Sequence, residues 1–292
     1  MLARKKPLPE LMPEYKELID KFLGTKKQKK LSELTLYSYQ RFLYHFFSGF
    51  TKEFKSLDYN DILTRLEEYE TGKQPSSIHQ RISILQGFLT FCFARGYLTK
   101  VPIKKWWRPD VPESLPKYLE SEEHAKAKIA SEKLNLRDRA LFEFLESSGC
   151  RRAEASSLKI ENLDLNNRVA RVLGKGNKLR KVDFSVECAM MLQDYLGDRV
   201  SGTGPVFLNK KGKGISDRWV YFVTDKVGKA SKLRRRLGPH VLRHTWACST
   251  YSKEEDLEFV RISLGHKDPK ITRIYVKIPT NKRRLLYQRY VG

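Results

Sequence analysis

Two histidines, an arginine and a tyrosine stand close together near the end of the sequence. They are His240, Arg243, His266 and Tyr275, in a stretch that reads GPHVLRHTWACSTYSKEEDLEFVRISLGHKDPKITRIYVK from residue 238 to residue 277. A tyrosine hydroxyl can form a covalent intermediate, and histidine can donate a hydrogen bond or move a proton near neutral pH. Arginine offers a planar, permanently charged fork that meets two oxygens of a phosphate. These residue types fit the attack of a tyrosine on a phosphodiester.

The local pattern predicts helices that position these residues. His240 and Arg243 are three residues apart, which puts them on one face of a helix whose first turn suits Pro239. Residues 256–264 carry apolar side chains at helical spacing, and Gly265 follows in the position that ends such a helix. A lone H-x-x-R pair is most often structural, and a lone tyrosine near a C-terminus usually packs. Only the ordered set points to chemistry.

Three motifs in this stretch resemble the catalytic end of the tyrosine recombinase (Xer and phage-integrase) family. They are H-x-L-R-H-T at residues 240–245, L-G-H at 264–266 and I-Y at 274–275. The resemblance implies two further features upstream. One is an arginine in a G-[LC]-R-x-x-E-x-x-x-L pattern, and the other is a lysine on a β-hairpin.

The upstream arginine lies in the sequence GCRRAEASSL, residues 149–158. Arg151 and Glu154 are three residues apart, so the carboxylate can hold the guanidinium in place as a supporting contact; the alternative is an ordinary surface ion pair. Arg152 departs from the family pattern, which usually has an apolar residue there. The spacing to Glu154 and Leu158 favours Arg151 over Arg152.

The lysine is expected in G-K-G-N-K, residues 174–178, between alternating segments that predict a short antiparallel sheet. The expected strands are residues 162–165, 168–173 and 179–184. The motif lacks the G-x-x-x-x-G-K-[ST] spacing of a nucleotide-binding loop. By the resemblance, Lys175 occupies the position of the catalytic lysine, and Lys178 is its nearest rival and otherwise a phosphate contact.

All six positions that the resemblance implies are filled, in the order Arg151, Lys175, His240, Arg243, His266 and Tyr275. The resemblance implies that Tyr275 forms a 3′-phosphotyrosyl link and releases a 5′-hydroxyl. Arg151, Arg243 and His266 would contact the non-bridging oxygens. Lys175 would protonate the leaving oxygen, and His240 would help to accept the tyrosine proton. This scheme requires no cofactor, neither ATP nor a metal.

The charge of the chain indicates a polyanionic partner. The 292 residues include 57 Lys and Arg against 34 Asp and Glu, which gives a net charge of +23. The surplus is spread along the chain, which favours a polyanionic partner over a merely cationic protein, and the resemblance implies that this partner is double-stranded DNA. No apolar stretch is long enough to cross a bilayer, and the N-terminus has no secretory pattern. We expect a cytoplasmic, nucleoid-associated protein with no membrane partner.

The four cysteines form no C-x-x-C pair and stand far apart in the sequence. They are Cys92, Cys150, Cys188 and Cys248. This spacing gives little support to a zinc site. We expect reduced cysteines that fill apolar space.

Residues 1–100 predict an all-helical domain, which the resemblance identifies as a core-binding domain on DNA. Aromatic and aliphatic residues from 36 to 50 recur at helical spacing, which favours core packing over a platform for stacking bases. A basic loop is expected at residues 26–30. The positions expected to face DNA, as phosphate contacts or as solvated surface, are Lys26, Lys27, Lys29, Lys30, Lys73, His79, Arg81, Lys178, Arg234 and Arg235.

The proline-rich residues 101–116 predict a linker, and residues 117–292 a catalytic domain that ends in a tail helix at about 281–290. The expected fold is mainly α with a small antiparallel β-sheet, a helical core-binding domain being followed by an α+β tyrosine-recombinase catalytic domain. The resemblance covers most of the chain.

The resulting hypothesis is a site-specific DNA recombinase, either Xer-like or a compact mobile-element integrase. A type IB topoisomerase is the alternative enzyme, and a DNA-binding protein without activity is the alternative of another class. Because exchange between two duplexes needs four cleavages and one chain offers one Tyr275, we expect a tetramer on two DNA sites. The net charge of +23 predicts a mainly monomeric free protein.

Overall fold

The computed structural model divides the chain into two compact units, Met1–Glu113 and Ser114–Gly292. It describes residues 7–104, 107–111, 115–174, 179–254 and 256–276. Lys175, Lys178 and the tail helix expected at 281–290 therefore lie outside the described residues. The division falls within the segment expected to be a linker. Part of that segment nevertheless belongs to the first unit, because Ile103 and Trp107 pack against its core.

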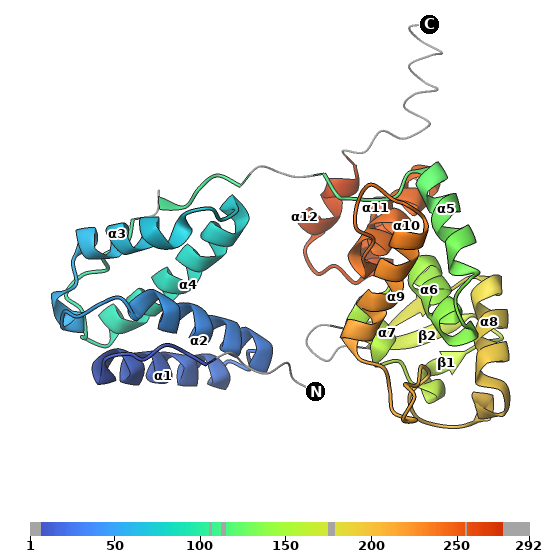
Figure 1. Cartoon of the computed structure of the whole chain (residues 1–292), viewed down its shortest axis with the longest axis horizontal. Coiled ribbons are helices and arrows are strands. Elements are labelled where there is room, and N and C mark those ends of the chain that lie inside the picture. Colours follow the sequence, from blue (N-terminus) through green and yellow to red (C-terminus); the bar gives the residue numbers. More distant parts are fainter. Residues whose placement is uncertain (1–6, 105–106, 112–114, 175–178, 255, 277–292) are drawn as a thin grey trace, which may run out of the picture. The chain divides into compact units, whose positions relative to one another are not determined.

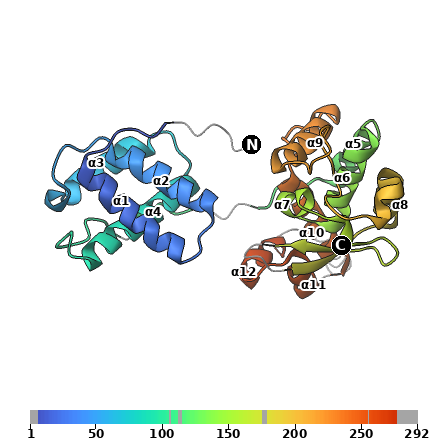
Figure 2. The same cartoon turned by 90° about the horizontal axis from the view of Figure 1, so that it is seen from below.

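The first unit is built from helices, as its amphipathic pattern predicts. Figure 1 and Figure 2 show α1 lying beside α2 and α4, and contacts between α2 and α3 complete the unit. The helices are α1 (Pro13–Gln28), α2 (Glu33–Phe47), α3 (Tyr59–Glu70) and α4 (Pro75–Ala94), with a 3₁₀ turn, η1 (Phe54–Ser56), before α3.

Helix α1 is longer than the sequence pattern indicates. The basic loop expected at residues 26–30 is wrong in its first half, because α1 continues through Gln28 and includes Lys26 and Lys27 in its last turn. Lysine is a good helix former, and its positive charge is favourable at a helix C-terminus. The ammonium group of Lys26 also lies 4.9 Å from the centre of the Phe22 ring.

The aromatic residues of α2 form the core of this unit and do not form an exposed platform. Phe42, Phe46 and Phe47 are buried, and the Phe47 ring packs edge-on against Phe88 of α4 at 5.4 Å between centroids. The prediction of core packing is therefore confirmed. Burial of these large rings contributes apolar area that holds the helices together.

The second unit combines helices with a three-stranded antiparallel sheet in the order β1-β2-β3. Its helices are α5 (Ser121–Ser131), α6 (Leu136–Ser148), α7 (Arg152–Ser156), α8 (Val186–Leu196), α9 (Asp217–Ala230), α10 (Pro239–Glu254), α11 (Leu257–Leu264) and α12 (Pro269–Thr272). Its strands are β1 (Leu163–Asp164), β2 (Val169–Leu173) and β3 (Leu179–Asp183), and 3₁₀ turns occur at η3 (Ile160–Asn162), η4 (Gly197–Ser201) and η5 (Arg273–Tyr275). The prediction of a mainly helical chain with a small antiparallel sheet is confirmed.

Helix α6 is the centre of this unit. It packs against α8, α9 and α10, and its side chains Leu141, Phe144 and Leu145 are fully buried. In both views α10, α11 and α12 lie next to one another (Figure 1, Figure 2).

All four cysteines are free and buried, as expected for apolar fillers. No helix in the described part of the chain is long and apolar enough to cross a membrane.

Candidate active site

Three arginines from other parts of the second unit donate hydrogen bonds to the C-terminal end of α11. The carbonyl oxygens of Ser263, Leu264 and Gly265 accept hydrogen bonds from Arg180, Arg243 and Arg151, respectively. The last carbonyls of a helix have no partner within the helix, and they carry partial negative charge. Gly265 ends α11 in the left-handed conformation, with φ of 64°, which turns the chain toward His266. The L-G-H motif thus provides two of the three acceptors around which the arginines gather.

Arg151 stands immediately before α7 and is held by Glu154. Its backbone N–H donates to Oε2 of Glu154 and its Nη1 donates to Oε1, each at 2.8 Å. Its Nη2 lies 3.5 Å from the carbonyl oxygen of Gly265, and 29% of its side chain is exposed. Arg152 is exposed instead, with its Nε 3.7 Å from Asp217. Of the two neighbouring arginines, only Arg151 reaches the end of α11.

Glu154 also contacts Arg180, which the sequence analysis did not identify. Nη2 of Arg180 donates to Oε2 of Glu154 at 2.7 Å, and its Nε donates to Oε1 at 3.3 Å. Burial raises the pKa of Glu154, but the hydrogen bonds and charges of Arg180 and Arg151 outweigh it, so the net shift is downward. The side chain is therefore a buried carboxylate, only 2% exposed. One signal was present in the sequence, because Arg180 shares the inward face of β3 with the buried Val182.

Arg243 is the most deeply buried of the three arginines, 4% exposed. Its Nη1 donates to the carbonyl of Gly149 at 2.7 Å, and its Nη2 donates to the carbonyl of Leu264 at 2.6 Å. Burial, with the charges of Arg151 and Arg180, lowers the pKa of Arg243 to about 10, so the group stays charged at neutral pH. Arg151, Arg180 and Arg243 are called the arginine group below. Glu154 forms ion pairs with Arg151 and Arg180, and its charge acts on Arg243 without direct contact, so one carboxylate faces three guanidinium groups and a surplus of two positive charges remains.

His266 has a definite tautomer in this arrangement. Its Nε2 lies 3.2 Å from Nη2 of Arg243, and its Nδ1 lies 2.9 Å from the hydroxyl of Thr272. Because a guanidinium can only donate, Nε2 accepts and Nδ1 carries the proton. Burial and the nearby arginines lower the pKa of His266 to about 4, which agrees with a neutral ring.

Tyr275 is buried in η5, 1% exposed, and its hydroxyl is bound to a histidine. Nδ1 of His244 lies 2.9 Å from the tyrosine oxygen. Burial raises the pKa of Tyr275 to about 12, and burial with the charges of His240 and Arg243 lowers the pKa of His244 to about 4. Both partners are therefore neutral near pH 7. His244 is the second residue that the sequence analysis did not single out, although it lies within the H-x-L-R-H-T motif.

His240 lies one turn before Arg243 on α10 and is exposed. Partial burial of its ring and the charges of Arg243, Arg152 and Arg151 lower its pKa. His240 is thus close enough to be affected by the arginine charges but is exposed, so it lies at the edge of the arginine group. The structure therefore brings together Arg151, Glu154, Arg243, His266 and Tyr275, with His240 on the solvent side.

The residues expected to face DNA occupy different surroundings. Lys73 and Arg81 both lie over the Tyr69 ring, at 4.1 and 4.9 Å from its centre. Arg235 forms an ion pair with Glu123 of α5 at 3.0 Å. The others in the described chain are exposed, apart from the half-buried Lys26: Lys27, Lys29, Lys30, His79 and Arg234.

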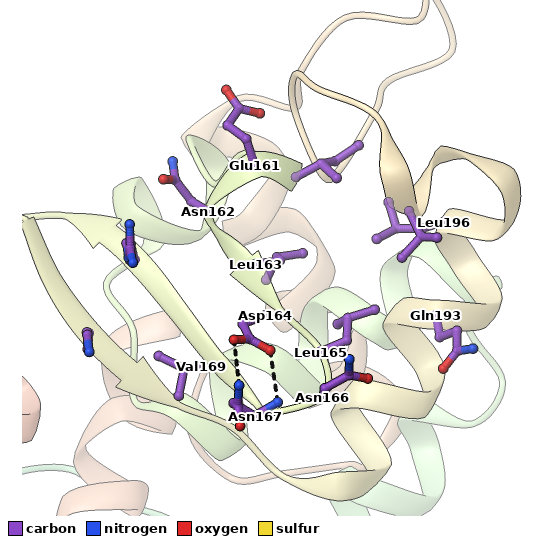
Figure 3. A pocket seen from close by; sticks show the side chains of 14 residues that line it. Glu161, Asn162, Leu163, Asp164, Leu165, Asn166, Asn167, Val169, Gln193 and Leu196 are labelled. Carbon is purple, nitrogen blue, oxygen red and sulfur yellow. Dashed lines mark hydrogen bonds between the residues drawn. The ribbon is translucent and has the colours of Figure 1, made fainter.

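The arginine group lies apart from a hollow in the same unit. The hollow, of about 700 Å³, lies beside β1 and α8 (Figure 3). There Asp164 accepts two hydrogen bonds from Asn167, and none of the residues of the arginine group lines the hollow. No three His, Cys, Asp or Glu side chains come together as metal ligands in the described part of the chain.

Comparison with known proteins gives a consistent match over both units. Residues 117–282 match the phage integrase family, and residues 19–96 match the phage integrase N-terminal SAM-like domain. Tyrosine recombinase XerC of Thermodesulfovibrio yellowstonii is 30% identical over 268 residues, which cover 87% of this chain and 88% of that protein. Tyrosine recombinase XerC of Vibrio cholerae is 34% identical over 215 residues, covering 71% of this chain and 68% of that protein.

Solved structures share the fold. The recombinase XerH bound to a palindromic difH substrate in a post-cleavage complex has a TM-score of 0.80 and 24% identity, covering 98% of this chain and 99% of that one. A lambda integrase tetramer bound to a Holliday junction has a TM-score of 0.71 and 17% identity, covering 87% and 77%. The matches favour strand exchange over the type IB topoisomerase alternative. The chain belongs to the phage integrase family of tyrosine recombinases, enzymes that exchange DNA strands.

Proposed function

We propose that the arginine group binds the scissile phosphate of a specific DNA site and that Tyr275 attacks it. The phenolic oxygen forms a bond to phosphorus while the bond to the 5′ oxygen breaks, which leaves a 3′-phosphotyrosyl link and a free 5′-hydroxyl. Attack by that hydroxyl, or by one from a second duplex, reverses the step and rejoins a strand. No ATP enters this scheme, because the phosphotyrosine preserves the energy of the broken bond, and no metal enters it, because the arginines supply the positive charge.

The positive surplus of the site carries this proposal. Arg151, Arg180 and Arg243 repel one another, and Glu154 compensates only one of their three charges. Like charges held close in a partly buried site cost free energy until an anion joins them. A phosphodiester that becomes more negative in its transition state is the ligand that this arrangement favours most.

Each side chain then has a distinct role. Arg151 contacts the non-bridging oxygens, and Arg243, which is 4% exposed in the DNA-free protein, reaches them once DNA binding opens the site. His266 is a further donor once the phosphate charge raises its affinity for a proton. His240, on the solvent side, helps to accept the tyrosine proton. Lys175, outside the described residues, is our candidate for protonating the leaving 5′ oxygen, with Lys178 as its rival.

Tyr275 has to change its surroundings for this reaction. A side chain that is 1% exposed and hydrogen-bonded to His244 has no access to a phosphate outside the protein. Binding of DNA would therefore draw η5 out of its packing against α10 and present the hydroxyl to the site. We include this movement in the proposal because cleavage requires it.

The proposal also covers the subtype of the recombinase and the number of protomers that assemble on DNA. The XerC relatives support an Xer-like recombinase, with a compact mobile-element integrase as the other subtype. The lambda integrase tetramer on a Holliday junction supports a tetramer on two DNA sites, formed from largely monomeric free protein. In this proposal residues 1–100 form the core-binding domain, residues 101–116 the linker and residues 117–292 the catalytic domain, all acting on DNA in the cytoplasm. Lys73 and Arg81, gathered on Tyr69, are the first candidates for phosphate contacts.

A nicked suicide substrate tests the nucleophile. The nick lets the short 5′-hydroxyl fragment diffuse away after cleavage, so the covalent adduct accumulates. Tyr275→Phe should bind the DNA as the parent protein does and form no adduct. An adduct that persists and maps by mass spectrometry to Tyr251, Tyr287 or Tyr290 would refute the assignment.

A further inference from the structure

Arg180 is a charged side chain in a position that a sheet normally gives to an apolar one. It points to the same face of β3 as Val182, which is buried, and only 13% of its own side chain is exposed. The flanking Leu179 and Lys181 point the other way and are exposed. Burying a guanidinium is costly unless its donors are satisfied, so its partners explain its place.

Those partners belong to two separate elements of the site. Two nitrogen atoms of Arg180, Nη2 and Nε, donate to the two oxygens of Glu154, and Nη1 donates to the carbonyl of Ser263 near the end of α11. All three guanidinium nitrogens thus have partners inside the protein. Arg151 differs, since it is more exposed and its Nη2 has only a long contact of 3.5 Å to Gly265.

Each carboxylate oxygen of Glu154 accepts one hydrogen bond from Arg151 and one from Arg180. Oε1 accepts from Nη1 of Arg151 and from Nε of Arg180, and Oε2 accepts from the backbone N–H of Arg151 and from Nη2 of Arg180. Without Arg180 the carboxylate would lose half of its hydrogen bonds and would no longer be tied to α11. Arg151 would then lose its fixed orientation, because Glu154 is the group that holds it.

Gly265 shows how closely the strand approaches the turn. A Cβ atom at Gly265 would lie 2.8 Å from Cδ of Arg180, closer than side chains tolerate. The stem of Arg180 therefore packs against the turn that carries His266, while its head holds Glu154. One side chain connects β3, the residues before α7 and the end of α11.

We propose that Arg180 is a positioning residue for strand cleavage, which holds Glu154 against the end of α11 and so fixes Arg151 and His266 toward the phosphate. The inference rests on the proposed function, in which Arg151 neutralises the scissile phosphate. Arg180 acts through Glu154 and the α11 carbonyl and makes no contact with DNA itself.

The test compares Arg180→Met and Arg180→Lys on two substrates. One is the nicked suicide substrate, and the other carries a methylphosphonate at the scissile position, where a methyl group replaces a charged non-bridging oxygen. On the normal phosphate both variants should form the adduct about 100-fold more slowly, because a misplaced clamp loses its transition-state contacts. DNA affinity should stay within about threefold, because uniform binding contacts are untouched.

On the methylphosphonate the deficit of both variants should shrink to a few-fold, since the charge that Arg151 neutralises is gone. A deficit that a general loss of structure produces would be the same on both substrates. Lys181→Met, on the opposite face of the same strand, is the matched control and should cleave at the parental rate.

Two results would overturn the inference alone. Cleavage by Arg180→Lys at the parental rate would mean that a positive charge at this position is sufficient and that the forked geometry of arginine is not needed. The second result is a rate deficit of the Arg180 variants that stays the same on the methylphosphonate while the deficit of Arg151→Ala becomes smaller. It would show that Arg180 does not act through the contact between Arg151 and the phosphate. If Arg151→Ala itself shows no relief, the assigned role of Arg151 fails, and the inference that rests on it fails with it. Should Arg180→Met unfold in a thermal melt, Arg180→Lys, which keeps a positive charge beside Glu154, carries the test alone.

Discussion

Nδ1 of His244 lies 2.9 Å from the hydroxyl oxygen of Tyr275, so the residue that follows Arg243 in the sequence holds the candidate nucleophile. Arg243 and His244 are adjacent on α10 and therefore point in different directions around the helix. One reaches the carbonyls at the end of α11, and the other reaches η5. Helix α10 thus joins the arginine group to the segment that carries the tyrosine.

Loss of this hydrogen bond should expose Tyr275. His244→Phe keeps a ring of similar size but removes the partner, and a typical hydrogen bond contributes about 1 kcal/mol, or roughly a fivefold change in an equilibrium. Acetylation of Tyr275 by N-acetylimidazole in the DNA-free protein, followed by peptide mass spectrometry, should become about fivefold faster. Ser249→Ala, at an exposed position of the same helix, should leave the rate unchanged. An unchanged rate in His244→Phe would show that packing alone retains the tyrosine.

Acid should destabilise the second unit through His244 and His266. The pKa of each is lowered from 6.5 to about 4, mainly by burial. The charges of His240 and Arg243 add to the shift of His244. The charges of Arg243, Arg151 and Arg180 add to the shift of His266. The unfolded chain binds these protons below about pH 6.5, whereas the folded chain binds them only near pH 4, so stability present above pH 6.5 is lost as the pH falls toward 4. The melting temperature should fall across this window, and His244→Gln should reduce the slope. An equal slope in that variant would contradict the assignment.

The leaving group gives a separate test of Lys175. General acid catalysis contributes about 100-fold or more, so Lys175→Ala should cleave normal DNA at least that much more slowly. A 5′-bridging phosphorothiolate has a sulfur leaving group that needs little protonation, and on it Lys175→Ala should recover to within about tenfold of the parent. Arg151→Ala should stay defective, because the transition-state charge still needs the clamp. Recovery by Lys178→Ala in place of Lys175→Ala would move the acid to Lys178.

Gly149 should be far more sensitive to substitution than another glycine with a similar backbone. It has φ of 59°, and an added Cβ would lie 2.9 Å from the Trp246 ring, whereas Gly212 has φ of 71° and open space around it. Gly212→Ala should cost about 1 kcal/mol for the left-handed conformation alone. Gly149→Ala should cost about 2–4 kcal/mol, since overpacking adds to it. Chemical denaturation followed by circular dichroism measures both, and equal losses would mean that Trp246 yields without cost.

The elements that the sequence predicts well are those set by local patterns. The strands expected at residues 168–173 and 179–184 lie within one residue of the observed β2 and β3, because the alternation of apolar and polar side chains is contained within each segment. The end of α1 was misjudged because lysines read equally well as a loop or as the last turn of a helix. Arg180 and His244 escaped notice because their partners, Glu154 and Tyr275, are 26 and 31 residues away in the sequence. A single charge on a strand or helix carries no local sign of what it will contact.

The end of α11 also bears on how this site tolerates mutation. The three acceptors that gather Arg151, Arg180 and Arg243 are main-chain atoms, so no change of side chain at Ser263 or Leu264 can delete them. Only a change in the path of the backbone can do so, and Gly265 is where that path is most constrained, by its positive φ and by the stem of Arg180. A change of side chain at the half-buried Ser263 therefore leaves all three acceptors in place, whereas a side chain at Gly265 would displace them together.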